Sequence, residues 1–174
     1  MTTATPVDCV AVALVAIAAI YDLRTRRIPN WLTMTALASG ILLNTALWHW
    51  SGLGRAATGF GLALLIYLPL YALHAMGGGD VKLMAALGCL VGPSAWFYIF
   101  ILTAITGGIV ALVVVLAQGL GGRTVRNIAH ILNEISHLRS PHHSQPELDV
   151  ANPAAVGLPH GAVIALGTLL YFLL

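Results

Sequence analysis

The sequence predicts an all-α membrane protein, built as a polytopic helix bundle with about six transmembrane segments. The chain of 174 residues is 59% hydrophobic and 8% charged, with a mean hydropathy of +0.89, whereas soluble domains carry roughly 25% charged residues. Its apolar residues form long blocks instead of an amphipathic pattern. Its basic residues gather between the blocks, as they do in membrane proteins. We therefore expect a single integral membrane domain over residues 1–174.

Six apolar blocks are the candidate spans, because a helix needs about 20 residues to cross the hydrocarbon layer. They cover residues 7–21, 31–48, 56–76, 81–91, 96–117 and 154–174. The fourth block is too short to cross a bilayer alone, and it ends at Gly92-Pro93. It either packs tilted against its neighbours or continues through Pro93 with a kink, since proline is tolerated in membrane helices. In the second case the count falls to five.

The first block has the alternative of being a cleaved signal peptide, because Ala16-Ile17-Ala18 resembles a small-residue cleavage site. However, no basic residue precedes the apolar run, and the arginines follow it. We therefore expect this block to stay in the protein as the first membrane helix.

The basic residues predict the orientation, because cytoplasmic loops of membrane proteins are rich in Lys and Arg. With six spans and a cytoplasmic first loop, every basic residue except Arg55 falls on the cytoplasmic side. These residues are Arg24, Arg26, Arg27, Lys82, Arg123, Arg126 and Arg139. Both termini then face outward.

Two of the six acids lie at the ends of predicted spans, Asp22 in the first and Asp80 between the third and fourth. A carboxylate at the edge of the hydrocarbon layer is costly, so such acids are functional candidates by default. The predicted topology places both at the cytoplasmic boundary. The short connection 51–54 makes the second and third spans antiparallel neighbours, which makes lateral proximity of the two acids plausible.

Two carboxylates that share a site tend to hold one proton between them. One can then take a proton from water while the other donates a proton to a peptide carbonyl oxygen, as in aspartic proteases. Glycines 77–79 precede Asp80, and glycine permits both close backbone approach and a positive φ. The simpler alternatives are an interfacial Asp22 paired with Arg26, and a flexible glycine turn.

Two motifs surround these acids. Asp22 is followed by Arg27-Ile28-Pro29-Asn30, and the second motif is Gly77-Gly78-Gly79-Asp80-Val81-Lys82. Together with Leu158-Pro159-His160-Gly161, they resemble the A24 family of type IV prepilin peptidases, which are GxGD-type membrane aspartic proteases. The resemblance covers nearly the whole chain, residues 22–167, and the shorter members of the family serve tight-adherence (Flp-type) pili.

The resemblance implies that Asp22 and Asp80 are the catalytic dyad of an enzyme that needs no cofactor. It also implies that the enzyme removes the leader of a prepilin at the cytoplasmic face of the bacterial inner membrane. Larger family members carry a cytoplasmic domain with paired cysteines that methylates the new N-terminus. The first loop here is short and has no cysteine, so we expect no N-methyltransferase domain. The expected partners are the prepilin leader and N-terminal helix, the lipid bilayer and possible pilus assembly machinery, and no nucleic acid.

Five further motif residues are expected to support the dyad: Gly77, Gly79, Lys82, Pro29 and Asn30. Pro29 and Asn30 end the first loop and begin the second helix, with Asn30 as a suitable N-cap. Lys82 has three alternatives: steadying an ionised aspartate, contacting the substrate, or snorkelling to the interface.

Residues 119–153 form a predicted cytoplasmic loop with an amphipathic helix, since Val125, Ile128, Leu132, Ile135 and Leu138 recur at helical spacing. That helix fits a role on the membrane surface, with capping of the site or docking of assembly proteins as alternatives. Its histidines, His130, His137, His142 and His143, lack acid or cysteine partners at ligand spacing, so we expect no metal site. Cys9 and Cys89 lie in apolar blocks without a CxxC pair, so we expect buried, inert thiols.

Two other functional classes remain open. A small transporter or channel would use Asp22 and Asp80 as a proton or cation relay. A non-catalytic membrane assembly subunit would keep the fold and lose the chemistry.

Overall fold

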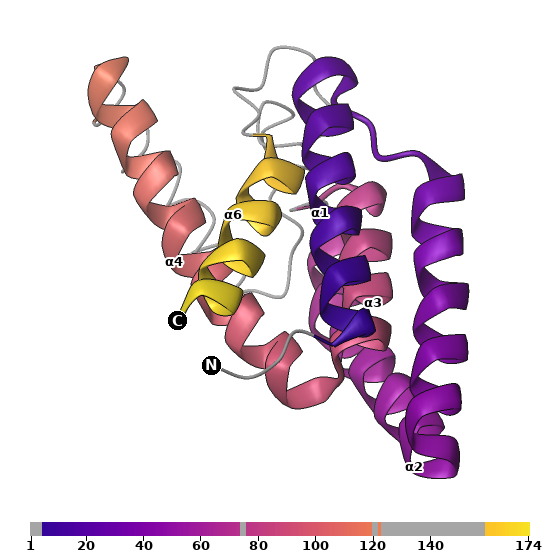
Figure 1. Cartoon of the computed structure of the whole chain (residues 1–174). Coiled ribbons are helices and arrows are strands. Elements are labelled where there is room, and N and C mark those ends of the chain that lie inside the picture. The colour runs from indigo at the N-terminus through magenta and orange to yellow at the C-terminus, as the bar shows by residue number, and fades with distance from the viewer. Residues whose placement is uncertain (1–4, 74–75, 120–121, 123–158) are drawn as a thin grey trace.

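A computed structural model of the chain describes residues 5–73, 76–119, 122 and 159–174. Its helices are α1 (Pro6–Thr25), α2 (Asn30–Ala72), α3 (Gly78–Val91), α4 (Pro93–Ala117) and α6 (His160–Leu173) (Figure 1). The all-α class is therefore confirmed. Among the described residues, α1, α2 and α4 are long and apolar enough to cross a membrane by length and composition, and α6 is a shorter apolar helix. The count of six spans stays a prediction.

Helix α1 is set at both ends by local interactions. Thr5 and Asp8 form a capping box at its start, and Arg26 ends it in the left-handed conformation with φ 53°. Its buried residues are Val7, Ala11, Leu14, Val15, Ala18 and Asp22. Because this spacing follows one helix face, Asp22 belongs to the face that packs inward. Cys9 lies on the exposed surface, so the prediction of a buried thiol there is wrong, while Cys89 is buried as predicted.

Helix α2 is not a single straight rod, because its helical geometry breaks at His49 (φ 52°, ψ −132°). Just beyond the break, Gly52 lies so close to the Asn44 carbonyl that a side chain there would collide with it. The break divides α2 into a first arm (residues 30–48) and a second arm (residues 50–72). These arms correspond to the second and third predicted spans, and the turn comes slightly earlier than the expected connection.

The two arms pass α3 in opposite directions. At the start of the first arm, Asn30 accepts a hydrogen bond from Lys82 near the beginning of α3. At the start of the second arm, Arg55 donates to a backbone carbonyl at the far end of α3, at 2.7 Å. At the end of the second arm, the Tyr71 ring covers Gly78, the first residue of α3. The predicted antiparallel arrangement is thus present, with α3 as the helix that both arms contact.

Helix α3 forms the centre of the bundle, and almost every residue from Val81 to Val91 is buried. Small residues allow its close packing, since Gly88 and Gly59 of the second arm approach so closely that neither has room for a side chain. Gly92 adopts a positive φ of 79° and separates α3 from α4. The fourth block therefore packs as a separate short helix, and it does not continue into α4 as one kinked helix.

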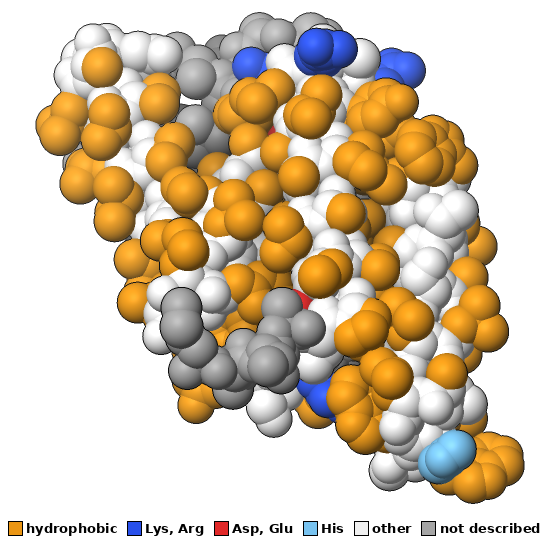
Figure 2. Space-filling view, in the orientation of Figure 1, with side chains coloured by type: hydrophobic (Ala, Val, Ile, Leu, Met, Phe, Trp, Pro, Cys, Tyr) orange, Lys and Arg blue, Asp and Glu red, His pale blue; other side chains and the backbone are white. Residues whose placement is uncertain are grey.

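The remaining helices complete the bundle, with α6 packed between α1 and α4 (Figure 1). Hydrophobic side chains cover the flank of the molecule, while Lys and Arg appear at the end where α1 finishes and again near the opposite end (Figure 2). The first group contains Arg24 and Arg26, which are exposed. The predicted amphipathic loop helix lies outside the described residues, as do Arg123, Arg126, Arg139, His130, His137, His142 and His143.

Candidate active site

Asp22 reaches the site from the inward face of α1, near the end of that helix. Its side chain is buried, at 8% exposure, and its Oδ2 accepts a hydrogen bond of 2.8 Å from the backbone N–H of Gly161 in the first turn of α6. A Cβ at position 161 would lie 3.0 Å from the Cβ of Asp22 and 3.1 Å from its Oδ2. The absence of a side chain at Gly161 therefore makes room for the carboxylate and brings the donor to it.

Asp80 reaches the site from the first turn of α3, where its N–H binds the Gly77 carbonyl at 3.1 Å. Its carboxylate is near enough to that of Asp22 for the two charges to repel each other. The buried Tyr67 of the second arm also interacts electrostatically with Asp80. The fold thus brings together two acids from helices that are distant in the sequence.

The glycines before Asp80 adopt ordinary torsions and pack against neighbouring side chains. Gly77 has φ −73°, and Gly92 and Gly119 are the positive-φ glycines of the described residues. The motif therefore does not use the positive φ that glycine permits. A Cβ at Gly78 would lie 3.4 Å from the Tyr71 ring, and a Cβ at Gly79 would lie 3.4 Å from the Ile28 side chain, both ordinary van der Waals distances.

The loop after α1 is attached to this glycine turn at two points. Ile28 packs over Gly79, and the Asn30 Oδ1 accepts a hydrogen bond of 3.0 Å from the Lys82 Nζ. The N-cap of α2 is Pro29, without a side-chain cap bond, so the prediction that Asn30 caps the helix is wrong. The amide of Asn30 ties the segment that follows Asp22 to the helix that carries Asp80.

Lys82 and Asp80 lie on different faces of α3. Two residues apart on a helix of 3.6 residues per turn, they are separated by roughly 200° around the axis. The ammonium group of Lys82 is directed to Asn30. The motif therefore sends its acid and its lysine to opposite sides of one helix.

A comparison with known proteins identifies the family. The model of the type IV leader peptidase family matches residues 9–112, which includes both acids. The chain belongs to the type IV leader peptidase family. Two proteins named prepilin leader peptidase/N-methyltransferase, from Burkholderia pseudomallei strains 1026b and K96243, are 34% identical over 109 residues. That alignment covers 58% of this chain and 34% of each relative, so the chain spans about a third of their length. No solved structure gives a significant match.

His160, the first residue of α6, also lies near Asp22. It interacts electrostatically with Asp22, and its Nε2 is buried without a hydrogen-bond partner among the described residues. His160, Gly161 and Ile28 belong to the motifs found in the sequence, but none of them was assigned a role there, and Tyr67 was missed. The proline–histidine–glycine start of the last helix was the available clue for the first two. No group of three His, Cys, Asp or Glu side chains that could hold a metal ion occurs in the described part of the chain.

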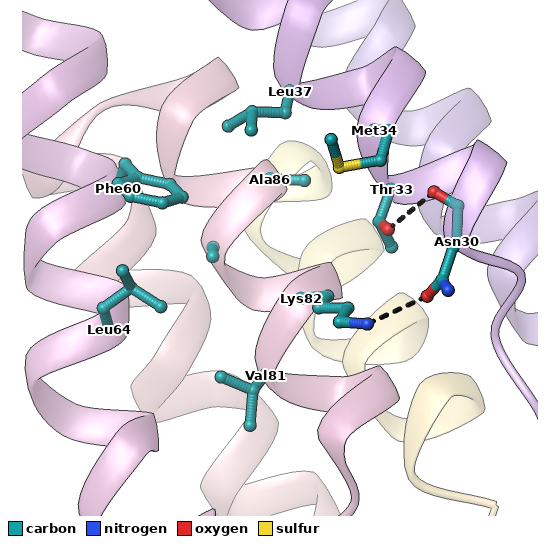
Figure 3. A pocket seen from close by; sticks show the side chains of 10 residues that line it. Asn30, Thr33, Met34, Leu37, Phe60, Leu64, Val81, Lys82 and Ala86 are labelled. Carbon is teal, nitrogen blue, oxygen red and sulfur yellow. Dashed lines mark hydrogen bonds between the residues drawn. The ribbon is translucent and has the colours of Figure 1, made fainter.

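A cavity of about 350 Å³ is lined on its α3 side by Val81, Lys82, Ala85 and Ala86 (Figure 3). By helical spacing these residues lie on the face of α3 that is turned away from Asp80. We call this cavity the lateral groove, and its walls come from the first arm, the second arm and α3. Its lining residues are Asn30, Thr33, Met34, Leu37, Phe60, Leu64, Val81, Lys82, Ala85 and Ala86. The pair Asn30–Lys82 stands at one end of this groove.

Proposed function

We propose that this member of the type IV leader peptidase family is an aspartic endopeptidase that removes the leader of type IV prepilins of the Flp type, with Asp22 and Asp80 as its catalytic residues. The observation that carries the proposal is the pairing of these carboxylates, brought together from α1 and α3. The Gly161 N–H holds Asp22 in one orientation. Family membership supplies the reaction class.

The chemistry follows from two facing carboxylates with one proton between them. The ionised carboxylate takes a proton from water as the water oxygen bonds to the carbonyl carbon of the scissile peptide. The protonated carboxyl donates its proton to the carbonyl oxygen. Collapse of the tetrahedral intermediate breaks the C–N bond, and the amine leaves with a proton from the dyad.

The depth and the side of the cut follow from the charge distribution. Asp22 lies in the last turn of α1 and Asp80 in the first turn of α3, and Arg24, Arg26 and Lys82 lie within a few residues of them in the sequence. Lys and Arg side chains gather at the end of the bundle where α1 finishes (Figure 2). By the rule that basic residues remain cytoplasmic, this end faces the cytoplasm of a bacterial cell, and the scissile bond is cut at the boundary of the inner membrane. Pilus assembly proteins would receive the product.

We further propose that this chain cleaves without methylating. The relatives are named for both activities, but α1 and α2 are joined here by residues 26–29 alone, with no cysteine among them. The product should therefore keep a free N-terminal amine. Mass spectrometry of the mature pilin tests this point, and an added methyl group in cells lacking any other methyltransferase would contradict it.

Co-expression with a Flp-type prepilin tests the dyad. Asp22→Asn and Asp80→Asn should each abolish leader removal, because an amide can neither take nor donate the required proton. Asp8→Asn is the matched control, because this acid lies in the first turn of α1 and asparagine keeps an oxygen for the capping box. Membrane insertion and helix content are measured for all three. Cleavage that persists in either dyad variant would overturn the assignment.

A proton or cation relay through the same acids is the competing function. The inward face of α1 between Asp8 and Asp22 consists of Ala11, Leu14, Val15 and Ala18, which offers no relay group along this helix. Reconstituted vesicles with a pH gradient distinguish the two functions. A relay predicts proton flux that either Asn variant stops, and the peptidase predicts no flux above that of empty vesicles.

A further inference from the structure

The lateral groove is open to the surface of the bundle and is separate from the proposed dyad. Met34, one of its lining residues, is 63% exposed, and Lys82 at its end is exposed. Asp80 lies on the opposite face of α3, so the body of this helix stands between the groove and the carboxylates. The groove is therefore not the place where a scissile peptide bond would meet the dyad.

The walls of the groove are apolar and its charge is confined to one end. Leu37, Phe60 and Leu64 are among its apolar lining residues, whereas Asn30 and Lys82 meet at one end (Figure 3). An apolar hollow does not hold water well, because water needs several polar partners. In a bundle surrounded by lipid, hydrocarbon chains are the material available to fill it.

The ammonium group of Lys82 favours an anionic headgroup. Its hydrogen bond is to the neutral amide of Asn30, and no acid among the described residues forms an ion pair with it. Basic pockets between membrane helices are typical sites for the headgroups of anionic lipids. A single molecule with an acyl chain and a phosphate would match both parts of the groove.

We propose that the lateral groove binds an anionic phospholipid, with one acyl chain between the two arms of α2 and its phosphate on Lys82. The site is defined by geometry on the far face of α3 from Asp80. It is independent of the proposed peptidase reaction, and its failure would leave the dyad assignment intact.

Photocrosslinking in vesicles of phosphatidylcholine with a minor fraction of phosphatidylglycerol tests the proposal. Phosphatidylglycerol and phosphatidylcholine probes carry the same diazirine acyl chain, and peptide mass spectrometry locates the adducts. We expect the phosphatidylglycerol probe to label the groove segments roughly fivefold more than the phosphatidylcholine probe, the effect of one basic residue near an anionic lipid. Lys82→Gln should reduce its labelling to the phosphatidylcholine level.

Two adjacent leucines provide the steric test and its control. Leu64→Trp should fill the groove and remove the adducts of both probes there, whereas Leu65→Trp, at a position that is 72% exposed and outside the groove, should not. Helix content by circular dichroism checks each variant, and Lys82→Gln, a change at the surface, keeps the test decisive should Leu64→Trp fail to fold. Equal labelling by both probes, labelling that survives Leu64→Trp, or labelling displaced by added prepilin would overturn the proposal.

Discussion

The two faces of the first turns of α3 differ in how they are packed. The face with Asp80 is closed, since Asp22 of α1 and Tyr67 of the second arm interact with it. The face with Lys82 is open and borders an apolar groove. The comparison shows that a short motif can serve two purposes, because residues two apart on a helix point in nearly opposite directions. The acid belongs to the closed face, and the lysine holds the loop and borders the groove.

On the closed face, adding a single methyl group should already lower the cleavage rate. In Gly161→Ala the new Cβ would lie 3.0–3.2 Å from the Asp22 side chain, so the carboxylate must shift by some tenths of an ångström. We expect leader cleavage to fall by up to roughly 10²-fold, the cost of misplacing a catalytic group. Initial rates with purified prepilin measure this.

Gly108→Ala is the control for that experiment, because a Cβ at position 108 meets nothing within 4 Å. Both substitutions replace glycine with the better helix former, so lost helix stability would not explain a difference between them. Equal rates for the two variants would show that the contact with Gly161 does not position Asp22.

Substitutions on the open face should lower the cleavage rate less, because they act through the Asn30–Lys82 hydrogen bond. Asn30→Ala and Lys82→Met each remove this bond, which ties the segment after Asp22 to α3. We expect each to slow cleavage by roughly threefold to tenfold, which corresponds to the typical net free energy of one hydrogen bond, about 0.5–1.5 kcal/mol. Because both remove the same bond, the double variant should be no slower than either single variant.

Asn30→Asp is the control for Asn30→Ala, because aspartate keeps an oxygen that accepts a hydrogen bond from Lys82. Its cleavage rate should therefore be close to that of the unchanged protein. A loss of cleavage rate in Lys82→Met without any loss in Asn30→Ala would contradict a role for the Asn30–Lys82 hydrogen bond. In that case Lys82 would act on the substrate directly.

Sequence patterns predicted those parts of the site that follow from the placement of charges along the chain. The basic residues between the apolar blocks predict that Asp22 and Asp80 lie at one end of the bundle. The inward face of α1 could not be predicted, because its apolar residues form a block without an amphipathic pattern. The wrong expectations concerned where single side chains point. Asn30 is a good N-cap by propensity, but its amide oxygen accepts a hydrogen bond from Lys82 of another helix. The spacing of residues within one segment contains no information about such a contact.

Other features could not be predicted from sequence patterns, because they depend on contacts between helices. The position of Gly161 beside Asp22 joins the two ends of the chain. The turn was expected at residues 51–54, and its actual position at His49 requires a positive φ that non-glycine residues rarely adopt, so no local preference marked that residue. The lateral groove needs three separate helical segments to form.

The smallest predicted effect concerns Tyr67, which bounds the closed face from the second arm. Its ring packs edge-on against Trp96 and Phe100, with centroids 6.1 Å and 6.0 Å away, while it also interacts electrostatically with Asp80. Tyr67→Phe keeps the ring packing and removes only the hydroxyl, so we expect a change in cleavage rate of less than about threefold, within the range for one neutral hydrogen bond. Tyr67→Ala removes the ring from the core and should destabilise the protein by about 3–5 kcal/mol. If Tyr67→Phe were as inactive as Asp22→Asn and Asp80→Asn, the Tyr67 hydroxyl would be a third reacting group beside the two carboxylates.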